Sequence, residues 1–111
     1  MGLAISDRGE GKPLVLIHGL ATDRTIWDRA LPLLAEGRRA IAIDVPGFGT
    51  SAPIGDGFEL QPVAEGILEG LLEAGVEEPF DVLGQSLGGA LALTLGAHQA
   101  GSVDRVVLGA P

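Results

Sequence analysis

The chain has 111 residues, enough for one domain (residues 1–111) and too few for two. Hydrophobic residues make up 46% of it and charged residues 20%, a balance typical of a folded domain. The formal net charge of −8 argues against nucleic acid and membrane surfaces as partners, and the lack of cysteine excludes disulfides and thiolate metal sites.

The N-terminal part of the chain predicts two strands. Residues 1–12 are polar and rich in glycine, without the apolar core of a signal peptide, so we expect a cytoplasmic location. Within this stretch, residues 3–5 favour a short edge strand. Residues 13–17 form a continuous, branched apolar run, which predicts a strand buried on both faces, as in a parallel sheet.

A helix is predicted next. Apolar residues from Ile26 to Leu34 follow helical spacing, with Thr22 and Asp23 as candidate N-terminal caps and Gly37 as a natural stop. Pro32 is expected to break or kink this helix, because proline removes a backbone donor.

The rest of the chain continues the alternation of strand and helix. The predicted elements are a strand over 40–43, a helix over 63–72 ending at Gly75, a strand over 80–83, a helix over 87–98 and a strand over 103–108. Crossovers of this length predict a three-layer α/β fold with a mostly parallel sheet and helices on both faces. Ligands bind at the carboxyl edge of such a sheet, where His18, Asp44 and Ser86 all fall.

The most informative motif is G-x-S-x-G at residues 84–88, between a predicted strand and a predicted helix. Gly84 and Gly88 are expected to be required where the strand and helix backbones crowd each other, and Ser86 is expected to adopt a strained conformation. A serine on such a turn is suited to nucleophilic attack on a carbonyl. The alternative is a glycine-rich turn with an incidental serine.

A second motif, His18-Gly19-Leu20, follows the strand over 13–17. A turn opened by glycine can direct a backbone N–H into the space above the serine. Together with the amide of Leu87, it would form a two-donor pocket for a developing oxyanion. For the His18 imidazole, a packed histidine that shapes the loop is preferred to a catalytic role.

A third motif covers residues 44–51, where glycines are expected to shape a loop bordering the pocket. Residues 47–52 also match a dinucleotide-binding fingerprint, which requires a helix directly afterwards. Pro53, Gly55 and Gly57 follow instead, so that interpretation is rejected. The interpretation as a nucleotide-binding domain is also disfavoured because the sequence has no phosphate loop with a lysine.

The three motifs together resemble the α/β-hydrolase family, in which H-G-x, D-x-P-G-x-G-x-S and G-x-S-x-G-G follow successive strands. The resemblance implies Ser86 as nucleophile and the amides of Leu20 and Leu87 as oxyanion donors. It further implies a small-molecule ester, lactone or related substrate and an acyl-enzyme. We expect no cofactor, and no metal, because the two histidines at positions 18 and 98 cannot share a ligand set. The nearest branch is that of lactonases, haloperoxidase-like enzymes and carbon–carbon hydrolases. Gln85 and Phe48 stand where many relatives have histidine.

Other parts of the family's machinery are missing. The family places its acid and its histidine after later strands. Here His98 lies twelve residues beyond Ser86 on the same predicted helix, or about 18 Å along its axis, and Asp104 begins a strand at the end away from the site. The chain therefore resembles the N-terminal half of a hydrolase, without the lid that often sets substrate choice.

Two expectations follow from this partial resemblance. The chain alone should be nearly inactive, and the alternative function is a non-catalytic fragment that binds or complements. The strand from Val103 to Leu108 would be an unpaired, valine-rich edge. Such an edge favours self-association or pairing with a missing C-terminal half.

Overall fold

The structure is a computed structural model, and it describes residues 3–46, 59–99 and 101–109. The elements in chain order are β1 (Ile5–Arg8), β2 (Pro13–Ile17), the 3₁₀ helix η1 (Arg24–Trp27), α1 (Leu31–Leu34), β3 (Arg39–Ile43), α2 (Leu60–Glu73), β4 (Phe80–Gln85), α3 (Leu87–His98) and β5 (Val103–Gly109).

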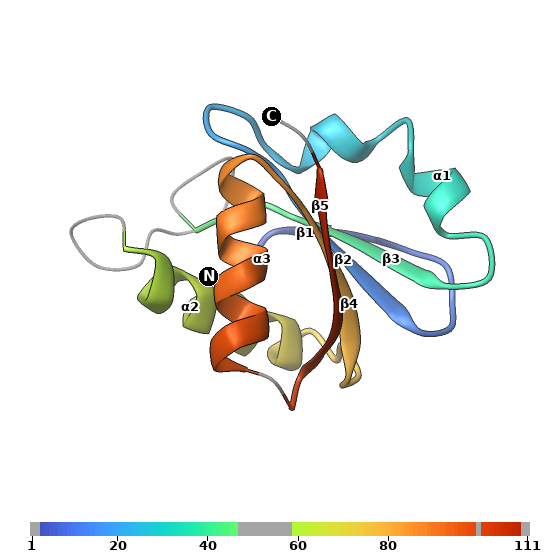
Figure 1. The fold of residues 1–111 in the computed structure, drawn as a ribbon. Helices are drawn as coiled ribbons and strands as arrows, with labels where there is room; N and C mark the ends of the chain where they lie inside the picture. The colour runs from blue at the N-terminus through green and yellow to red at the C-terminus, as the bar shows by residue number, and fades with distance from the viewer. Residues whose placement is uncertain (1–2, 47–58, 100, 110–111) are drawn as a thin grey trace.

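The five described strands form one sheet in the order β1-β3-β2-β4-β5. Strands β3, β2, β4 and β5 are parallel, and β1 pairs antiparallel with β3 at one edge. Figure 1 shows β5 at the opposite edge of the sheet. The predicted α/β fold with a mostly parallel sheet is therefore confirmed, because each long crossover returns the chain in the same direction.

Helices cover both faces of the sheet. On one face, α2 and α3 bury a large apolar cluster that includes Ile17, Ile43 and Phe80. On the other face, η1 and α1 cover a smaller cluster around Leu14 and Leu16, over β2 and β3. The three-layer arrangement agrees with the prediction. None of the helices in the described ranges is long and apolar enough to cross a membrane.

The first predicted helix differs from the structure. It is two short helices, η1 and α1, and the break lies at residues 28–30 rather than at Pro32. Pro32 instead occupies the first turn of α1, where a missing backbone donor costs little. Asp23 does cap η1, because its carboxylate accepts a hydrogen bond from the Thr25 amide at 2.9 Å. Thr22 is not a cap.

The first strand is also displaced from its predicted position. It spans Ile5–Arg8 rather than residues 3–5, and pairs with β3 by the register Ile5 to Ile43. The Ala4 carbonyl, just before β1, accepts a hydrogen bond from the Asp44 amide at 2.9 Å. Sequence pattern alone missed the polar residues of β1, since an edge strand need not alternate in polarity.

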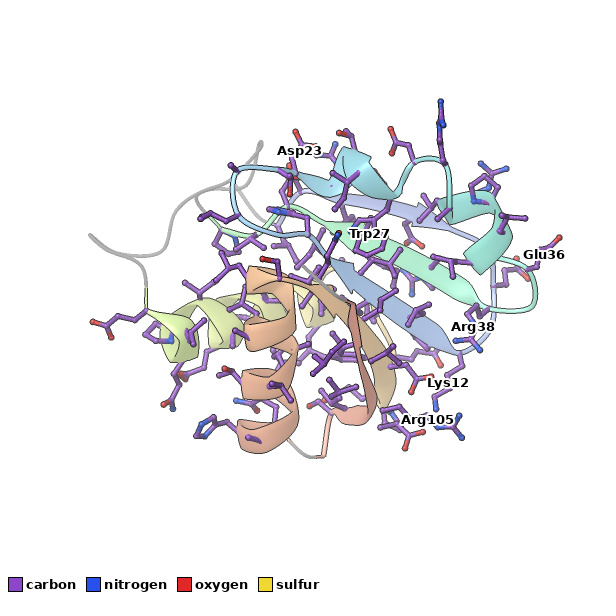
Figure 2. The ribbon with its side chains drawn as sticks, turned by 45° about the horizontal axis from the view of Figure 1, so that its top comes forward. Lys12, Asp23, Trp27, Glu36, Arg38 and Arg105 are labelled. Carbon is purple, nitrogen blue, oxygen red and sulfur yellow. The ribbon has the colours of Figure 1, made fainter. Side chains whose placement is uncertain are left out.

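Charged side chains gather at the amino ends of the parallel strands, the end opposite to the predicted site. Figure 2 shows Lys12, Arg38 and Arg105 at this end. The Lys12 ammonium lies 3.3 Å from the Asp81 carboxylate and also pairs with Asp104. Lys12 thus links the starts of β2, β4 and β5.

Candidate active site

The predicted serine turn is present at the junction of β4 and α3. Ser86 has φ 57° and ψ −118°, a conformation that non-glycine residues rarely adopt and that costs about 1–3 kcal/mol. The side chain is exposed to solvent. The strained backbone predicted for this serine is therefore observed, and its hydroxyl is accessible.

Close backbone approach explains the glycines around the serine. A Cβ atom on Gly84 would lie 2.1 Å from the Gly88 carbonyl oxygen, and one on Gly88 would lie 2.2 Å from the Ile17 carbonyl oxygen. No real Cβ tolerates such distances to backbone. The first turn of α3 consequently packs directly against the ends of β4 and β2.

The His18-Gly19-Leu20 loop lies against the same serine. A Cβ on Gly19 would lie 3.1 Å from the Ser86 Cβ and 3.7 Å from its Oγ. The structure thus brings together two motifs that are far apart in the sequence. Ala21, next in the loop, has φ 61° and is strained like Ser86.

His18 is fully buried and its ring is held on both sides. The Val45 amide donates to Nε2 at 2.9 Å, so Nε2 is an acceptor. Nδ1 lies 2.7 Å from the Gly19 carbonyl oxygen, which requires the proton to be on Nδ1. The Thr22 hydroxyl donates to the same carbonyl at 2.7 Å. A neutral imidazole with both nitrogens engaged fixes the turn that carries Gly19.

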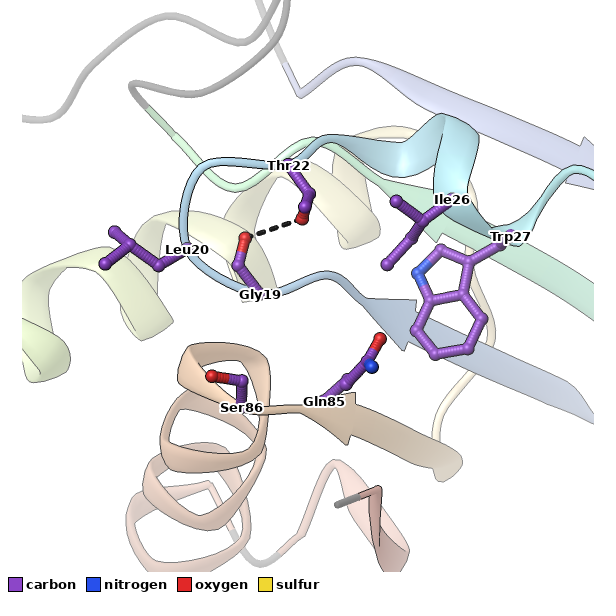
Figure 3. Close-up of a pocket in the computed structure, with 7 residues that line it drawn as sticks. All are labelled: Gly19, Leu20, Thr22, Ile26, Trp27, Gln85 and Ser86. Atoms are coloured by element: carbon purple, nitrogen blue, oxygen red, sulfur yellow. Dashed lines mark hydrogen bonds between the residues drawn. The ribbon is translucent and has the colours of Figure 1, made fainter. Parts of the chain in front are cut away.

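The two backbone amides predicted as donors belong to Leu87 and Leu20. Leu87 is the first residue of α3, so its N–H has no acceptor within the helix. Leu20 lines the same cleft, and its side chain is 67% exposed and directed away from Ser86 (Figure 3). Donors at a helix N-terminus beside a nucleophile are suited to stabilising negative charge on an attacked carbonyl.

These residues line a cleft of about 440 Å³. The described lining consists of Gly19, Leu20, Thr22, Ile26, Trp27, Gln85 and Ser86 (Figure 3). Sequence reasoning did not place Ile26 and Trp27 in a site, because their helical spacing indicated only a core face. The third predicted motif lies mostly outside the described residues, which omit 47–58.

Asp44, at the end of β3, anchors the wall of the cleft. Its carboxylate is fully buried and accepts hydrogen bonds from the Arg24 amide at 2.8 Å and the Arg24 guanidinium at 2.6 Å. Since Arg24 begins η1, this ion pair positions the helix that carries Ile26 and Trp27. The role of Asp44 was not recognised in the sequence beyond its place at the sheet edge.

The structure does not bring an acid or a histidine to the serine. No histidine, aspartate or glutamate is among the described residues that line the cleft. His98 ends α3, and Asp104 lies at the amino end of β5. Within the described ranges, no group of three or more His, Asp or Glu side chains could hold a metal ion.

Comparison with known proteins identifies the family. Residues 12–111 match the family model for the alpha/beta hydrolase fold, and the chain belongs to this family. It is 37% identical over 107 residues to a 2-hydroxymuconate semialdehyde hydrolase of Pseudomonas sp. strain CF600, covering 94% of this chain and 38% of that protein. It is 36% identical over 108 residues to a pimeloyl-[acyl-carrier protein] methyl ester esterase of Methylococcus capsulatus, covering 97% and 40%.

Comparison with solved structures agrees with this family assignment. A thermophilic esterase from Thermogutta terrifontis superimposes with a TM-score of 0.88 at 28% identity, over 96% of this chain and 39% of that one. The chain thus spans about two fifths of the length of the relatives it matches. These relatives are hydrolases and esterases.

Proposed function

We propose that this chain carries the nucleophile half of a serine hydrolase, which acts on an ester, lactone or related bond through an acyl-enzyme on Ser86. The observation that carries the proposal is the strained, exposed Ser86 beside the first turn of α3 and the Gly19 loop. The amides of Leu20 and Leu87 are the proposed oxyanion donors. Loss of one such donor typically costs about 3 kcal/mol of transition-state stabilisation.

The proposal includes low activity for this chain alone. The sequence holds two histidines. His18 has both ring nitrogens engaged in the loop, and His98 lies at the far end of α3. Without a base, the serine hydroxyl keeps its proton, and loss of the histidine from a serine triad costs about 10⁶ in turnover.

Labelling with a fluorophosphonate followed by peptide mass spectrometry tests the nucleophile. We expect slow modification confined to Ser86. Ser102 is a built-in comparison, because its hydroxyl is buried and donates to Glu78. Equal labelling of Ser102 or Ser6 would contradict the assignment of Ser86, and labelling of Ser86 within seconds would contradict the absence of a base.

A non-catalytic role in binding or complementation is the second candidate. The absence of acidic residues and histidine from the described cleft lining favours it. If Ser86→Ala leaves every function of the chain unchanged, this second candidate replaces the first.

We further propose that the β5 edge pairs with additional polypeptide, either a C-terminal half of the protein or, by self-association, a second copy of this chain. Val107 is 51% exposed and Leu108 53% exposed. Val107 pairs with Leu83 on the face where η1 and α1 cover only β2 and β3. Apolar side chains beside an unpaired edge favour strand addition.

Size-exclusion chromatography tests this edge. We expect the 11.3-kDa chain to elute above its monomer mass and Val107→Lys to shift it toward the monomer. Leu93→Lys is the matched control, since Leu93 is also 53% exposed but lies on α3. A stable wild-type monomer, or an equal effect of both lysines, would contradict the proposal.

A further inference from the structure

The apolar residues of the short helix η1 line the cleft instead of being buried in the core. None of the residues of η1 is buried, and Ile26 is 41% exposed. Figure 3 shows Ile26 and Trp27 projecting from η1 toward the turn that carries Gln85 and Ser86. Exposed apolar side chains that lie together in a cleft are typical of a wall that binds a ligand.

The surface that these two residues present to the cleft is hydrocarbon. The Trp27 ring carries one polar atom, Nε1, which is inaccessible to solvent. Trp27 therefore exposes ring carbons, and its side chain also packs against the Leu14 and Leu16 cluster on the sheet. Ile26 has no polar side-chain atom. A ligand on this side of the cleft consequently meets an apolar wall.

The buried Asp44 carboxylate and strand β1 hold this wall in place. Asp44 accepts hydrogen bonds from the Arg24 amide at 2.8 Å and the Arg24 guanidinium at 2.6 Å. The Arg24 Nε also donates to the Ser6 hydroxyl on β1 at 3.0 Å. Because Arg24 begins η1, the helix is fastened at its start to two strands. A wall that is fixed before binding loses little conformational entropy when a ligand arrives, and this favours affinity.

The described lining of the cleft contains no charged side chain. Ser86 and Gln85 supply a hydroxyl and an amide, and the Thr22 hydroxyl donates to the Gly19 carbonyl at 2.7 Å. A cleft of about 440 Å³ has room for a carbonyl at Ser86 and a neighbouring group against η1. A charge on that group would lose water without gaining a counter-charge from the described lining, so an uncharged group is favoured.

We propose that Ile26 and Trp27 form an apolar subsite that binds an uncharged hydrocarbon group next to the scissile bond of the substrate. The subsite selects esters with an extended alkyl chain over esters with a short or charged chain. This inference rests on the proposed hydrolase function, and it deepens that function by naming a substrate class and the residues that select it.

Ligand binding to the Ser86→Ala chain tests the subsite without any reaction. Trp27 is the single tryptophan, so its indole N–H gives one resolved NMR signal from the ¹⁵N-labelled full chain. This signal is followed while methyl butanoate, methyl hexanoate or monomethyl adipate is added. Since each buried methylene tightens binding about fourfold, methyl hexanoate should bind about four to sixteen times tighter than methyl butanoate. Monomethyl adipate, which ends in a carboxylate, should bind more weakly than methyl hexanoate.

Two substitutions of nearly equal shape isolate the apolar contact, each made in the Ser86→Ala chain. Ile26→Val keeps a hydrocarbon surface and should retain the preference for methyl hexanoate over methyl butanoate. Ile26→Thr differs from it by a hydroxyl in place of one methyl group, and should lower that preference by about twofold or more. Leu33→Thr is the matched control and should leave the preference unchanged. Leu33 is 69% exposed on the neighbouring α1 but is not among the described lining residues.

Three results would overturn the subsite: an indole signal that methyl hexanoate leaves unmoved, equal preferences in Ile26→Thr and Ile26→Val, or tighter binding of monomethyl adipate than of methyl hexanoate. Circular dichroism establishes that each variant is folded, and Ile26→Ala takes the place of Ile26→Thr if the latter does not fold. Because Ser86 is absent from every chain, failure of the subsite is distinguishable from failure of the nucleophile, which fluorophosphonate labelling tests separately.

Discussion

Ser86 and Ala21 are the two non-glycine residues with positive φ in the described ranges. Ser86 lines the cleft, and Ala21 lies in the loop between two lining residues, Leu20 and Thr22. Such conformations persist only where the surrounding backbone fixes them. At Ser86 the conformation is fixed by the close backbone packing at Gly84 and Gly88, which leaves no room for the chain to relax. The close packing at these two neighbouring glycines thus explains the strained backbone of the proposed nucleophile.

Gly84→Ala should destabilise the fold by about 1–3 kcal/mol, because the added methyl group meets the Gly88 backbone rather than a flexible side chain. Urea unfolding measures the change. Gly101→Ala is the control, since a Cβ there has nothing within 4 Å. Equal stabilities for the two variants would show that the strand–helix junction is looser than described.

At this scale, the sequence predicts Ser86 and its glycines well, since their spacing is dictated by local backbone geometry. It does not predict that Trp27 and Gln85 line the same cleft. These residues are 58 positions apart, and both reach the cleft because η1 lies over the face of the sheet that carries the Leu14 and Leu16 cluster. Short-range patterns carry no information on that arrangement.

Among the elements, η1 depends on the buried Asp44 for its position. Removal of one partner from a buried ion pair leaves the other charge without compensation. Asp44→Ala should therefore lower the free energy of unfolding by about 3 kcal/mol, at the low end of the usual range because the Arg24 side chain is 26% exposed.

Asp7→Ala is the control for this measurement. Asp7 pairs with Arg39 at 2.6 Å, but both side chains are partly exposed, and such pairs contribute less than about 1 kcal/mol. Chemical denaturation of both variants gives the comparison. A cost for Asp7→Ala that equals the cost for Asp44→Ala would contradict the anchoring role of Asp44.

At the opposite end of the sheet, the link between β2 and β5 should depend on pH. The hydrogen bond and charge of Lys12 hold the pKa of Asp104 below its ordinary value of 3.8. The stability that this pair contributes is then present above pH 3.8 and is lost as pH falls through the lowered pKa.

Urea midpoints of the wild type and Asp104→Asn, measured from pH 7 down to pH 2, test this link. We expect the wild type to be more stable at pH 7 and the difference to vanish in acid. A difference that grows on acidification would reverse the sign and reject the pairing.

The elements themselves were largely predictable. Apolar runs marked the four parallel strands, and Gly75, with φ 81°, follows α2 as expected. The division of the first predicted helix into η1 and α1 was not predictable. Pro32 is tolerated in the initial turn of α1, and the break at residues 28–30 contains no proline or glycine. Edge strand β1 was displaced because its pairing with β3, rather than its composition, determines its limits.

For the whole molecule, the parallel topology brings the serine turn and the Gly19 loop to one edge of the sheet, where the end of β3 also lies. The sequence order of the motifs was enough to predict this convergence, because parallel strands share their carboxyl edge. No histidine or acidic residue is among the described residues that line the cleft around Ser86. The proposed nucleophile therefore has no candidate base within this described lining.

The most direct test of this account is rescue by imidazole, a small base that can enter the cleft. Hydrolysis of p-nitrophenyl butyrate is measured for the wild type and for Ser86→Ala over a series of imidazole concentrations. The rates of Ser86→Ala correct for hydrolysis by imidazole itself. We expect the wild-type rate to rise with imidazole above that of Ser86→Ala. Identical rates for the two chains at every concentration would contradict the assignment of Ser86 as the nucleophile.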